Sequence, residues 1–295
     1  MLRYAAIDVG SNAVRLLIAD ISKRDGKYKY KKNTLIRVPL RLGDDAFLDH
    51  HISERKAGDL IKTMAAFKGL MDVYHVSEYL ACATSAMREA GNGQDIVKQI
   101  KAQTDLTLEI IEGQREANII YANHIEEDLD ENKTYLYIDV GGGSTELSVF
   151  VKGVPEASRS FNIGTIRMLD NQDKEETWDE MKEWVKEHTK SQKHLAAIGT
   201  GGNINKLFRM SDEKDGAPMS IQKLNALYNR LTSYSLKERI HELGLNPDRA
   251  DVIIPASEIY LTLMKWTGIK QIYVPKVGMA DGIIKLLIEE KLDQA

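Results

Sequence analysis

A four-residue sequence occurs twice in this chain of 295 residues, both times in the same local context. Ile7-Asp8-Val9-Gly10 recurs as Ile138-Asp139-Val140-Gly141, 131 residues further on. In each copy an apolar run typical of a buried strand delivers an aspartate, small residues follow, and a second apolar run begins. Such self-similarity indicates a duplicated structural unit, so the chain is expected to fold as two related domains.

Strands and helices are expected to alternate along the whole chain, which predicts an α/β fold. Each half reads as a βββαβα unit, and we expect domains at 1–126 and 127–295, with the last helix able to pack back on the first domain. The two domains are expected to face each other across a cleft, where ligands usually bind. Expected strands lie at 3–8, 13–21, 27–40, 78–83, 106–111, 134–140, 145–151, 155–161, 195–199 and 271–274, and the longest expected helices at 53–74, 93–104, 116–126, 178–189, 251–266 and 279–290.

The charge balance and the apolar runs narrow the class of protein. The formal net charge is −4, so no general basic field attracts polyanions, and nucleic acid is not expected as a partner. The single cysteine, Cys82, excludes an internal disulfide and suits a reducing compartment. No signal-peptide pattern opens the sequence, and no apolar run approaches the ~20 residues that span a bilayer. We therefore expect a cytoplasmic protein without a membrane partner.

The second copy of the repeat continues into a glycine-rich turn. Gly141, Gly142 and Gly143 allow a close approach of the backbone to a ligand, and their N–H groups can form an anion-binding concavity. Ser144 and Thr145 add hydroxyl donors. Asp139 and Glu146 flank the turn, and two carboxylates beside a phosphate loop suggest Mg²⁺. The alternative is a glycine-rich hairpin whose carboxylates face solvent.

Two further loops share this character. The first copy of the repeat is poorer in glycine but supplies Ser11, Asn12 and the cation Arg15. A third loop, which contains Gly201 and Gly202, ends a strand and opens a helix, where backbone N–H groups favour anions. One such loop is a weak signal, but three in one chain, two of them on duplicated strands, indicate phosphate binding.

Two charged residues outside these loops are candidates for the same site. Glu116 lies in the first turn of an expected helix, where it is either a carboxylate favoured by the helix dipole or a general base that deprotonates water. Arg88 is either a phosphate contact or an exposed cation on a helix. Spacing alone leaves both alternatives open.

Taken together, five segments resemble the exopolyphosphatase/guanosine pentaphosphate phosphohydrolase family over nearly the whole chain. The resemblance implies two ribonuclease-H-like domains of the actin, Hsp70 and sugar kinase superfamily. Long members of the family carry additional C-terminal helical domains, whereas this chain ends after the second expected domain, which favours short polyphosphates or a nucleotide as substrates. The segments that carry the resemblance are Ala6–Asn12, Ala83–Arg88, Ile111–Ala117, Ile138–Glu146 and Gly199–Gly202.

The resemblance also implies an activity and a role for each candidate residue. It implies Mg²⁺-dependent hydrolysis of the terminal phosphate of inorganic polyphosphate or, alternatively, of the 5′ γ-phosphate of guanosine pentaphosphate, by a homodimer. It makes Glu116 the catalytic base, places Asp139 and Glu146 at the Mg²⁺ site, and has Asp8 hold Mg²⁺ through water. The phosphate contacts that it implies are Ser11, Asn12, Arg15, Arg88, Gly141, Gly142, Gly143, Ser144, Thr145, Gly201 and Gly202.

Two other functions use the same superfamily cleft. A kinase would transfer the phosphate to an acceptor, so its consumption of ATP would require that acceptor. A non-enzymatic phosphate sensor would bind tightly and release no phosphate. The presence of Glu116 argues against the sensor.

Overall fold

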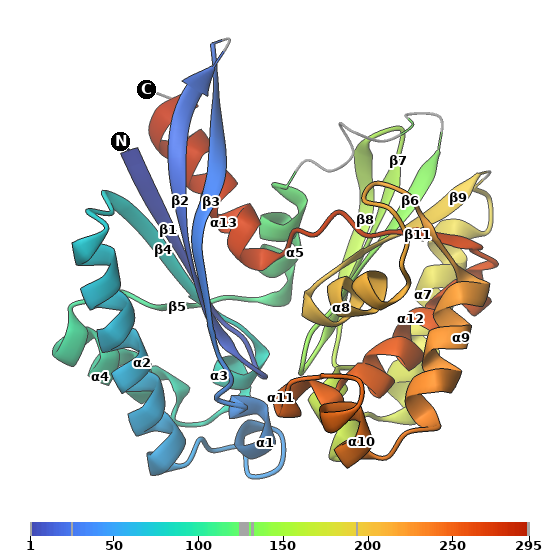
Figure 1. Ribbon diagram of the computed structural model, residues 1–295, viewed down its shortest axis with the longest axis horizontal. Coiled ribbons are helices and arrows are strands. Elements are labelled where there is room, and N and C mark those ends of the chain that lie inside the picture. Colours follow the sequence, from blue (N-terminus) through green and yellow to red (C-terminus); the bar gives the residue numbers. More distant parts are fainter. Residues whose placement is uncertain (1, 25, 124–129, 131–132, 193, 294–295) are drawn as a thin grey trace. The chain divides into compact units, whose positions relative to one another are not determined.

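The computed structural model describes residues 2–24, 26–123, 130, 133–192 and 194–293. The chain divides into two compact units, each of which is described by itself (Figure 1). Unit 1 comprises Met1–Asn123 together with Gly278–Ala295, and unit 2 comprises His124–Val277. The expected boundary between 126 and 127 falls outside the described residues, and the C-terminal helix, which the expected second domain included, belongs to unit 1.

Unit 1 contains a five-stranded mixed sheet in the order β3-β2-β1-β4-β5. β1 pairs with β2 in antiparallel and with β4 in parallel orientation, and the inner part of β1 is buried continuously, as expected of a central strand. The strands are β1 Leu2–Val9, β2 Val14–Arg24, β3 Lys27–Val38, β4 Glu78–Ala83 and β5 Glu109–Ile110.

Helices cover both faces of this sheet (Figure 1). On one face lie α2 and α4, and the apolar positions of α2 recur at helical spacing and are buried. On the other face lie α5 and α13, which pack against each other. The helices of unit 1 are α1 Leu42–Ala46, α2 Glu54–Val73, α3 Ser85–Glu89, α4 Gly93–Thr104, α5 Gly113–Tyr121 and α13 Met279–Ile288, which continues as a π-helical turn over Glu289–Asp293.

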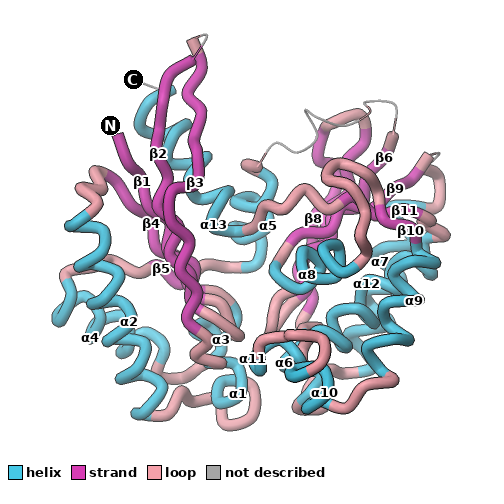
Figure 2. Tube along the Cα trace, viewed as in Figure 1, coloured by secondary structure: helices cyan, strands magenta, loops and turns pink. Residues whose placement is uncertain are grey.

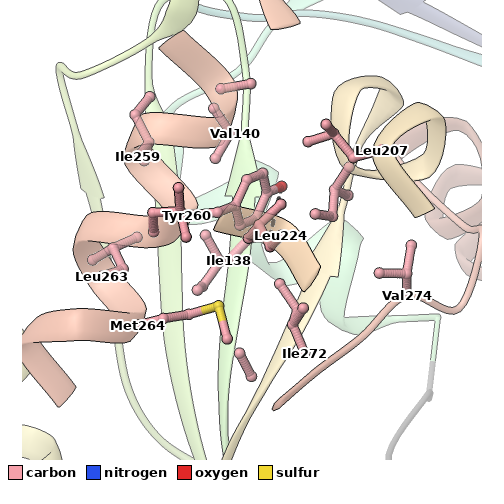
Figure 3. Close-up of a cluster of buried hydrophobic side chains, with 14 of the residues drawn as sticks. Ile138, Val140, Leu207, Leu224, Ile259, Tyr260, Leu263, Met264, Ile272 and Val274 are labelled. Atoms are coloured by element: carbon pink, nitrogen blue, oxygen red, sulfur yellow. Dashed lines mark hydrogen bonds between the residues drawn. The ribbon is translucent and has the colours of Figure 1, made fainter. Parts of the chain in front are cut away.

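Unit 2 contains a six-stranded sheet in the order β10-β11-β9-β6-β7-β8. Its core is formed where α12 packs on the sheet, and Figure 3 shows Tyr260 of α12 pointing at Ile138 of β6. The strands are β6 Thr134–Val140, β7 Thr145–Val151, β8 Val154–Phe161, β9 Leu195–Thr200, β10 Met219–Ser220 and β11 Gln271–Tyr273. The helices are α6 Thr165–Leu169, α7 Glu175–Thr189, α8 Gly202–Met210, α9 Ile221–Thr232, α10 Leu236–His241, α11 Pro247–Ala250 and α12 Ile253–Thr267.

The two sheets share one strand order, which is the structural counterpart of the sequence repeat (Figure 2). Strands β3-β2-β1-β4-β5 of unit 1 correspond to β8-β7-β6-β9-β11 of unit 2, where β10 is an added edge strand. The register agrees as well, because Asp8 lies opposite Arg15 and Asp139 lies opposite Glu146. The predicted α/β class is confirmed.

Several short elements differ from the sequence-based expectation. The structure adds α1, α3, α6, α11 and β10, each of five residues or fewer, and the twelve-residue helix α9. The expected strand at 106–111 is reduced to β5, because only two of its residues pair with β4. The expected helix at 116–126 begins at Gly113 and ends at Tyr121. Among the helices of the described residues, none is both long and apolar enough to span a membrane.

Candidate active site

The turn between the first two strands has the same backbone geometry in both units. In unit 1 the Gly10 N–H donates to the Ala13 carbonyl at 3.2 Å, and in unit 2 the Gly141 N–H donates to the Ser144 carbonyl at 2.9 Å. These pairs are related by the same offset of 131 residues as the sequence repeat. The two turns are therefore equivalent, and their side chains can be compared position by position.

In unit 2, the carbonyl groups of the turn are held by the short helix α6. The N–H groups of Thr165 and Ile166 donate to the carbonyls of Gly141 and Gly142, at 3.1 and 2.8 Å. The carbonyl of the next residue, Gly143, accepts a hydrogen bond of 2.6 Å from the Nε atom of Arg167. Arg167 is only 6% exposed, so a buried positive charge lies against the turn.

These hydrogen bonds fix the direction of the peptide N–H groups. In a planar trans peptide the N–H points opposite to the C=O, and the described residues contain no cis peptide. Since three successive carbonyls point at α6 and Arg167, the N–H groups of Gly142, Gly143 and Ser144 point away from them. Successive N–H groups of this kind form an anion-binding concavity.

The turn of unit 1 is held in the same way by the residues around α1. The Gly43 N–H donates to the Ser11 carbonyl at 2.9 Å, and the Arg41 N–H donates to the Asn12 carbonyl at 3.0 Å. By the same geometry, the N–H groups of Asn12 and Ala13 point away from α1. Both units therefore contain a turn whose amide groups are pre-oriented by a short helix that follows the third strand.

In unit 2 the two predicted metal ligands lie directly opposite each other. Asp139 of β6 pairs with Glu146 of β7, so both side chains project from the same face of the sheet, with Cβ atoms roughly 5 Å apart. Glu146 is 4% exposed, and its Oε1 atom accepts a hydrogen bond of 2.8 Å from Ser160 Oγ. The third loop meets this pair, because a Cβ atom at Gly201 would lie 2.7 Å from Asp139 Oδ1.

This donor set fits a magnesium ion that is completed by its substrate. Among the described residues, no group of three or more His, Cys, Asp or Glu side chains is arranged to hold a metal. Mg²⁺ usually takes one or two carboxylates, several waters and substrate phosphates, not a cage built entirely of protein atoms. Asp139 and Glu146 beside the amide concavity supply the protein part of such a site.

In unit 1 the equivalent pair is an ion pair. Arg15 Nη1 lies 2.7 Å from Asp8 Oδ2, and the Asp8 side chain is 6% exposed against 29% for Arg15. Asp8 therefore has its charge balanced within the protein. The guanidinium group of Arg15 is fixed by this contact. Its other N–H groups are hydrogen-bond donors of the kind that bind phosphate.

Hydrogen bonds connect the first turn of unit 1 to two other predicted motifs. The hydroxyl groups of Ser11 and Ser85 lie 2.9 Å apart, so the turn contacts the start of α3. From α3, Arg88 Nη1 donates to the Ile111 carbonyl at 2.6 Å, immediately before α5. Its side chain is 18% exposed and lies 3.9 Å from a Glu112 carboxylate oxygen. Arg88 is therefore a half-buried bridge between α3 and α5, and not an exposed cation on a helix.

Glu116 lies in the first turn of α5, on the same side of the sheet as Asp8. Its Oε2 atom is buried. Cys82, which pairs with Asp8 across β1 and β4, is also buried, and burial with the nearby charges of Glu109, Asp8 and Glu116 raises its thiol pKa to about 12. Asp8 and Glu116 therefore both act electrostatically on one buried position of the sheet.

The structure gives two of the predicted phosphate contacts additional bonds. Thr145 is fully buried, and its hydroxyl donates to the Ile163 carbonyl at 2.6 Å, which favours a structural role for that side chain. Gly202 is the first residue of α8, and its carbonyl accepts a hydrogen bond from Arg249 Nη1. The buried hydroxyl of Tyr260 donates to the Thr200 carbonyl at 2.7 Å and so fixes the strand end before Gly201.

Sequence reasoning missed three residues of these sites. Arg167 and Gly164 hold the glycine turn, and a Cβ atom at Gly164 would lie 2.5 Å from the Gly142 carbonyl oxygen. Both lie in a segment without a regular pattern, so no signal pointed to them. Ser85 had a signal, because the duplication makes the loop after β4 equivalent to the loop after β9, where Gly201 was predicted.

Comparisons with known proteins agree on one family. The sequence model described as the Ppx/GppA phosphatase family matches residues 34–290. A bifunctional 3-dehydroquinate synthase/phosphatase of Fusobacterium nucleatum is 27% identical over 97% of this chain, which spans only 47% of that relative. Exopolyphosphatase 1 of Mycobacterium leprae is 23% identical over 99% of this chain and 91% of its own length. The crystal structure of an exopolyphosphatase from Cytophaga hutchinsonii has the same fold, with a TM-score of 0.83, 23% identity and 98% of both chains covered.

Proposed function

Because this chain belongs to the Ppx/GppA phosphatase family, we propose that it is an exopolyphosphatase, which hydrolyses the terminal phosphoric anhydride bond of inorganic polyphosphate with Mg²⁺. Relatives named exopolyphosphatase extend over nearly the whole chain, such as the one from Mycobacterium leprae, which supports this choice within the family. Guanosine pentaphosphate is the alternative substrate. A cytoplasmic location and a homodimer stay predictions.

One observation carries the proposal. Three peptide N–H groups of the glycine turn in unit 2 are oriented by bonds to the carbonyls behind them, beside two carboxylates on adjacent strands. N–H groups that are fixed before the substrate binds stabilise negative charge without reorganisation. Hydrolysis of a phosphoric anhydride depends mainly on such positioning and electrostatic stabilisation.

In this proposal each residue has its own role in the hydrolysis. The amide groups of Gly142, Gly143 and Ser144 bind the oxygens of the terminal phosphoryl group, with Arg167 adding positive potential from behind. Mg²⁺ held by Asp139 and Glu146 would offset charge on the phosphate oxygens. Glu116 orients a water molecule and accepts its proton as the new P–O bond forms. The bond to the remaining polyphosphate then breaks, and the shortened chain leaves with the electron pair.

A substrate panel tests the proposal. Phosphate release is measured on short polyphosphate, long polyphosphate and guanosine pentaphosphate, each with Mg²⁺ and with chelator. We expect release from short polyphosphate, abolished by the chelator. Release from guanosine pentaphosphate alone would establish the alternative substrate, and ATP consumption that requires an acceptor would establish a kinase.

The catalytic base is tested with a matched pair of substitutions at the start of α5. Glu116→Gln retains the shape of the side chain and removes its basicity, so turnover should fall by about 10²–10⁴-fold. Glu112→Gln makes the same change four residues earlier, at a side chain that is 81% exposed, and should leave turnover near the native rate. A folded Glu116→Gln variant with normal turnover would remove Glu116 from the mechanism.

A further inference from the structure

The backbone of α13 passes very close to that of α5, the helix that carries Glu116. A Cβ atom at Gly282 of α13 would lie 1.9 Å from the Ile119 carbonyl oxygen and 2.7 Å from its carbonyl carbon. Real Cβ contacts are never this short, so any other residue at 282 would displace one of the two helices. Ile119 lies one turn after Glu116, roughly 4.5 Å along the axis of α5.

Polar contacts hold the C-terminal end of α5 to α13 as well. Lys285 Nζ donates to the Asn123 carbonyl, just beyond the end of α5. The Asn123 side chain donates from Nδ2 to the Ile120 carbonyl at 2.9 Å and to the Gly278 carbonyl at 3.3 Å. Asn123 is 4% exposed, so these bonds are shielded from water. They tie the residues that follow α5 to both ends of the contact with α13.

The helix α13 is itself anchored to the sheet. Asp281, which is 5% exposed, accepts hydrogen bonds from Tyr30 Oη at 2.8 Å and from Lys32 Nζ at 3.0 Å, both on β3. Its Oδ2 atom also accepts the Gly278 N–H at 3.1 Å, as the acid of a capping box. Burial and the Asp281 carboxylate raise the pKa of the Tyr30 phenol, so Tyr30 stays a donor.

Apolar packing completes the contact between the two helices. Both belong to one buried cluster that also includes inward-facing residues of β1 and β2. Small shifts in such a layer are resisted because protein interiors are close-packed. The helix residues in this cluster are Ile119 and Ile120 of α5, and Met279, Ala280, Ile283, Ile284, Leu287 and Ile288 of α13.

The N-terminal end of α5 is fixed by separate contacts. The Ile111 N–H donates to the Ala83 carbonyl at 2.9 Å, and the Ile111 carbonyl accepts the bond from Arg88. Glu116 therefore lies between two anchors, one on β4 and α3 and the other on α13. Only the anchor on α13 can be changed by substitution without touching a predicted phosphate contact, because the other anchor includes Arg88.

We propose that Gly282 is a positioning residue for Glu116: its missing side chain lets α13 set the axial position of α5, and Lys285 holds the same helix at its end. The inference rests on the proposed function, because it requires Glu116 to act in hydrolysis. A displacement of about 1 Å at a reacting group can lower the rate by about 100-fold. Gly282 thus acts on catalysis through α5 and without touching the substrate.

The test combines Gly282→Ala with Glu116→Gln. We expect Gly282→Ala to lower kcat by about 10–100-fold with KM unchanged. In the Glu116→Gln background the same substitution should cause no further loss, because the group it displaces no longer acts. An unchanged kcat for Gly282→Ala, or an equal loss in both backgrounds, would overturn the proposal.

Controls separate positioning from loss of stability. Leu60→Ala opens a cavity under α2, on the other face of the sheet, and should destabilise unit 1 while kcat below the unfolding transition stays native. If Gly282→Ala does not fold, Lys285→Met removes the bond to Asn123 and should lower kcat less, again only when Glu116 is present. Native turnover by Glu116→Gln would end both the base assignment and this inference. A slow Glu116→Gln beside a native Gly282→Ala, or beside a native Lys285→Met if Gly282→Ala does not fold, would end the inference alone.

Discussion

The two repeated turns have the same backbone geometry but differ in the charges that flank them. In unit 1 the residues across the strand pair are Asp8 and Arg15, which form an ion pair at 2.7 Å. In unit 2 the same two positions hold Asp139 and Glu146, both acidic. The amide groups of both turns are oriented by a short helix after the third strand.

This difference shows that the backbone offers the anion site and the flanking side chains decide what binds with the anion. A carboxylate balanced by arginine has little need of a cation, whereas two carboxylates on one face repel each other unless a cation lies between them. In the proposed function, unit 2 therefore supplies the ligands of the metal and the phosphate, whereas unit 1 supplies Glu116 and a charge-balanced Asp8.

The largest expected effect compares the two aspartates. Asp139→Asn should lower Mg²⁺-dependent turnover by more than about 100-fold, because it removes a ligand from an acidic pair. Asp8→Asn should lower turnover by only about 10-fold, because Arg15 already balances the charge of Asp8. Turnover measured across a Mg²⁺ titration checks both. Equal losses would mean that the charge difference between the turns has no functional meaning.

The next effect concerns stability rather than turnover. Arg15→Gln leaves the buried Asp8 without its counter-charge and should lower the free energy of unfolding by about 1–3 kcal/mol. Urea unfolding of this variant, and of Arg15→Gln combined with Asp8→Asn, gives the measurement. The double variant should recover most of the loss, since no buried charge then lacks a partner. A double variant as unstable as the single one would contradict this explanation.

A third comparison concerns the residue that follows the strand partner of the repeated aspartate, which is Cys82 for Asp8 and Thr200 for Asp139. Unit 1 has Ala83 there, whereas unit 2 has Gly201 with a φ of +98° and no room for a Cβ beside Asp139. Gly201→Ala should therefore lower the free energy of unfolding by about 1–3 kcal/mol and raise the Mg²⁺ requirement. Ala83→Gly is the reciprocal control and should leave the Mg²⁺ requirement unchanged. A native Mg²⁺ requirement in Gly201→Ala would show that the glycine serves the backbone alone.

The smallest effect uses Cys82, which occupies the position of Thr200 in the other repeat. Its pKa is raised to about 12, so the folded protein keeps the thiol proton at pH values where the unfolded chain loses it, above about 8.5. The free energy of unfolding should fall by about 1 kcal/mol between pH 8.5 and 9.5 on this account. Cys82→Ala should lack that part of the pH dependence. An identical dependence in both proteins would refute the assignment.

Local patterns were enough to predict the strand pairs around each turn. The expected strands at 134–140 and 145–151 coincide with β6 and β7. Apolar runs lie on both sides of three glycines, so the position of the turn determines which residues of the two strands pair. The helix α9 was missed although its signal was present, with Ser220 as N-cap and leucines at helical spacing. The sequence could therefore have predicted α9.

The elements that orient the turns could not be predicted from local sequence. α1 and α6 have five residues each and lack a side-chain cap, so tertiary contacts, including those with the turns, stabilise them. Likewise, the bonds between Ser11 and Ser85 and between Arg88 and Ile111 join segments that are 74 and 23 residues apart. Candidate residues could be named from motifs, but their grouping depends on the strand order.

The placement of α13 has a consequence for how the protein is made. During translation, β1 to α5 leave the ribosome first, and α13 emerges only after all of unit 2 has been synthesised. Unit 2 is continuous in sequence and can fold as a nascent domain, while α5 still has its apolar face exposed. The helix with the proposed base gains its partner last, so a chain interrupted within unit 2 would lack the helix that packs against α5.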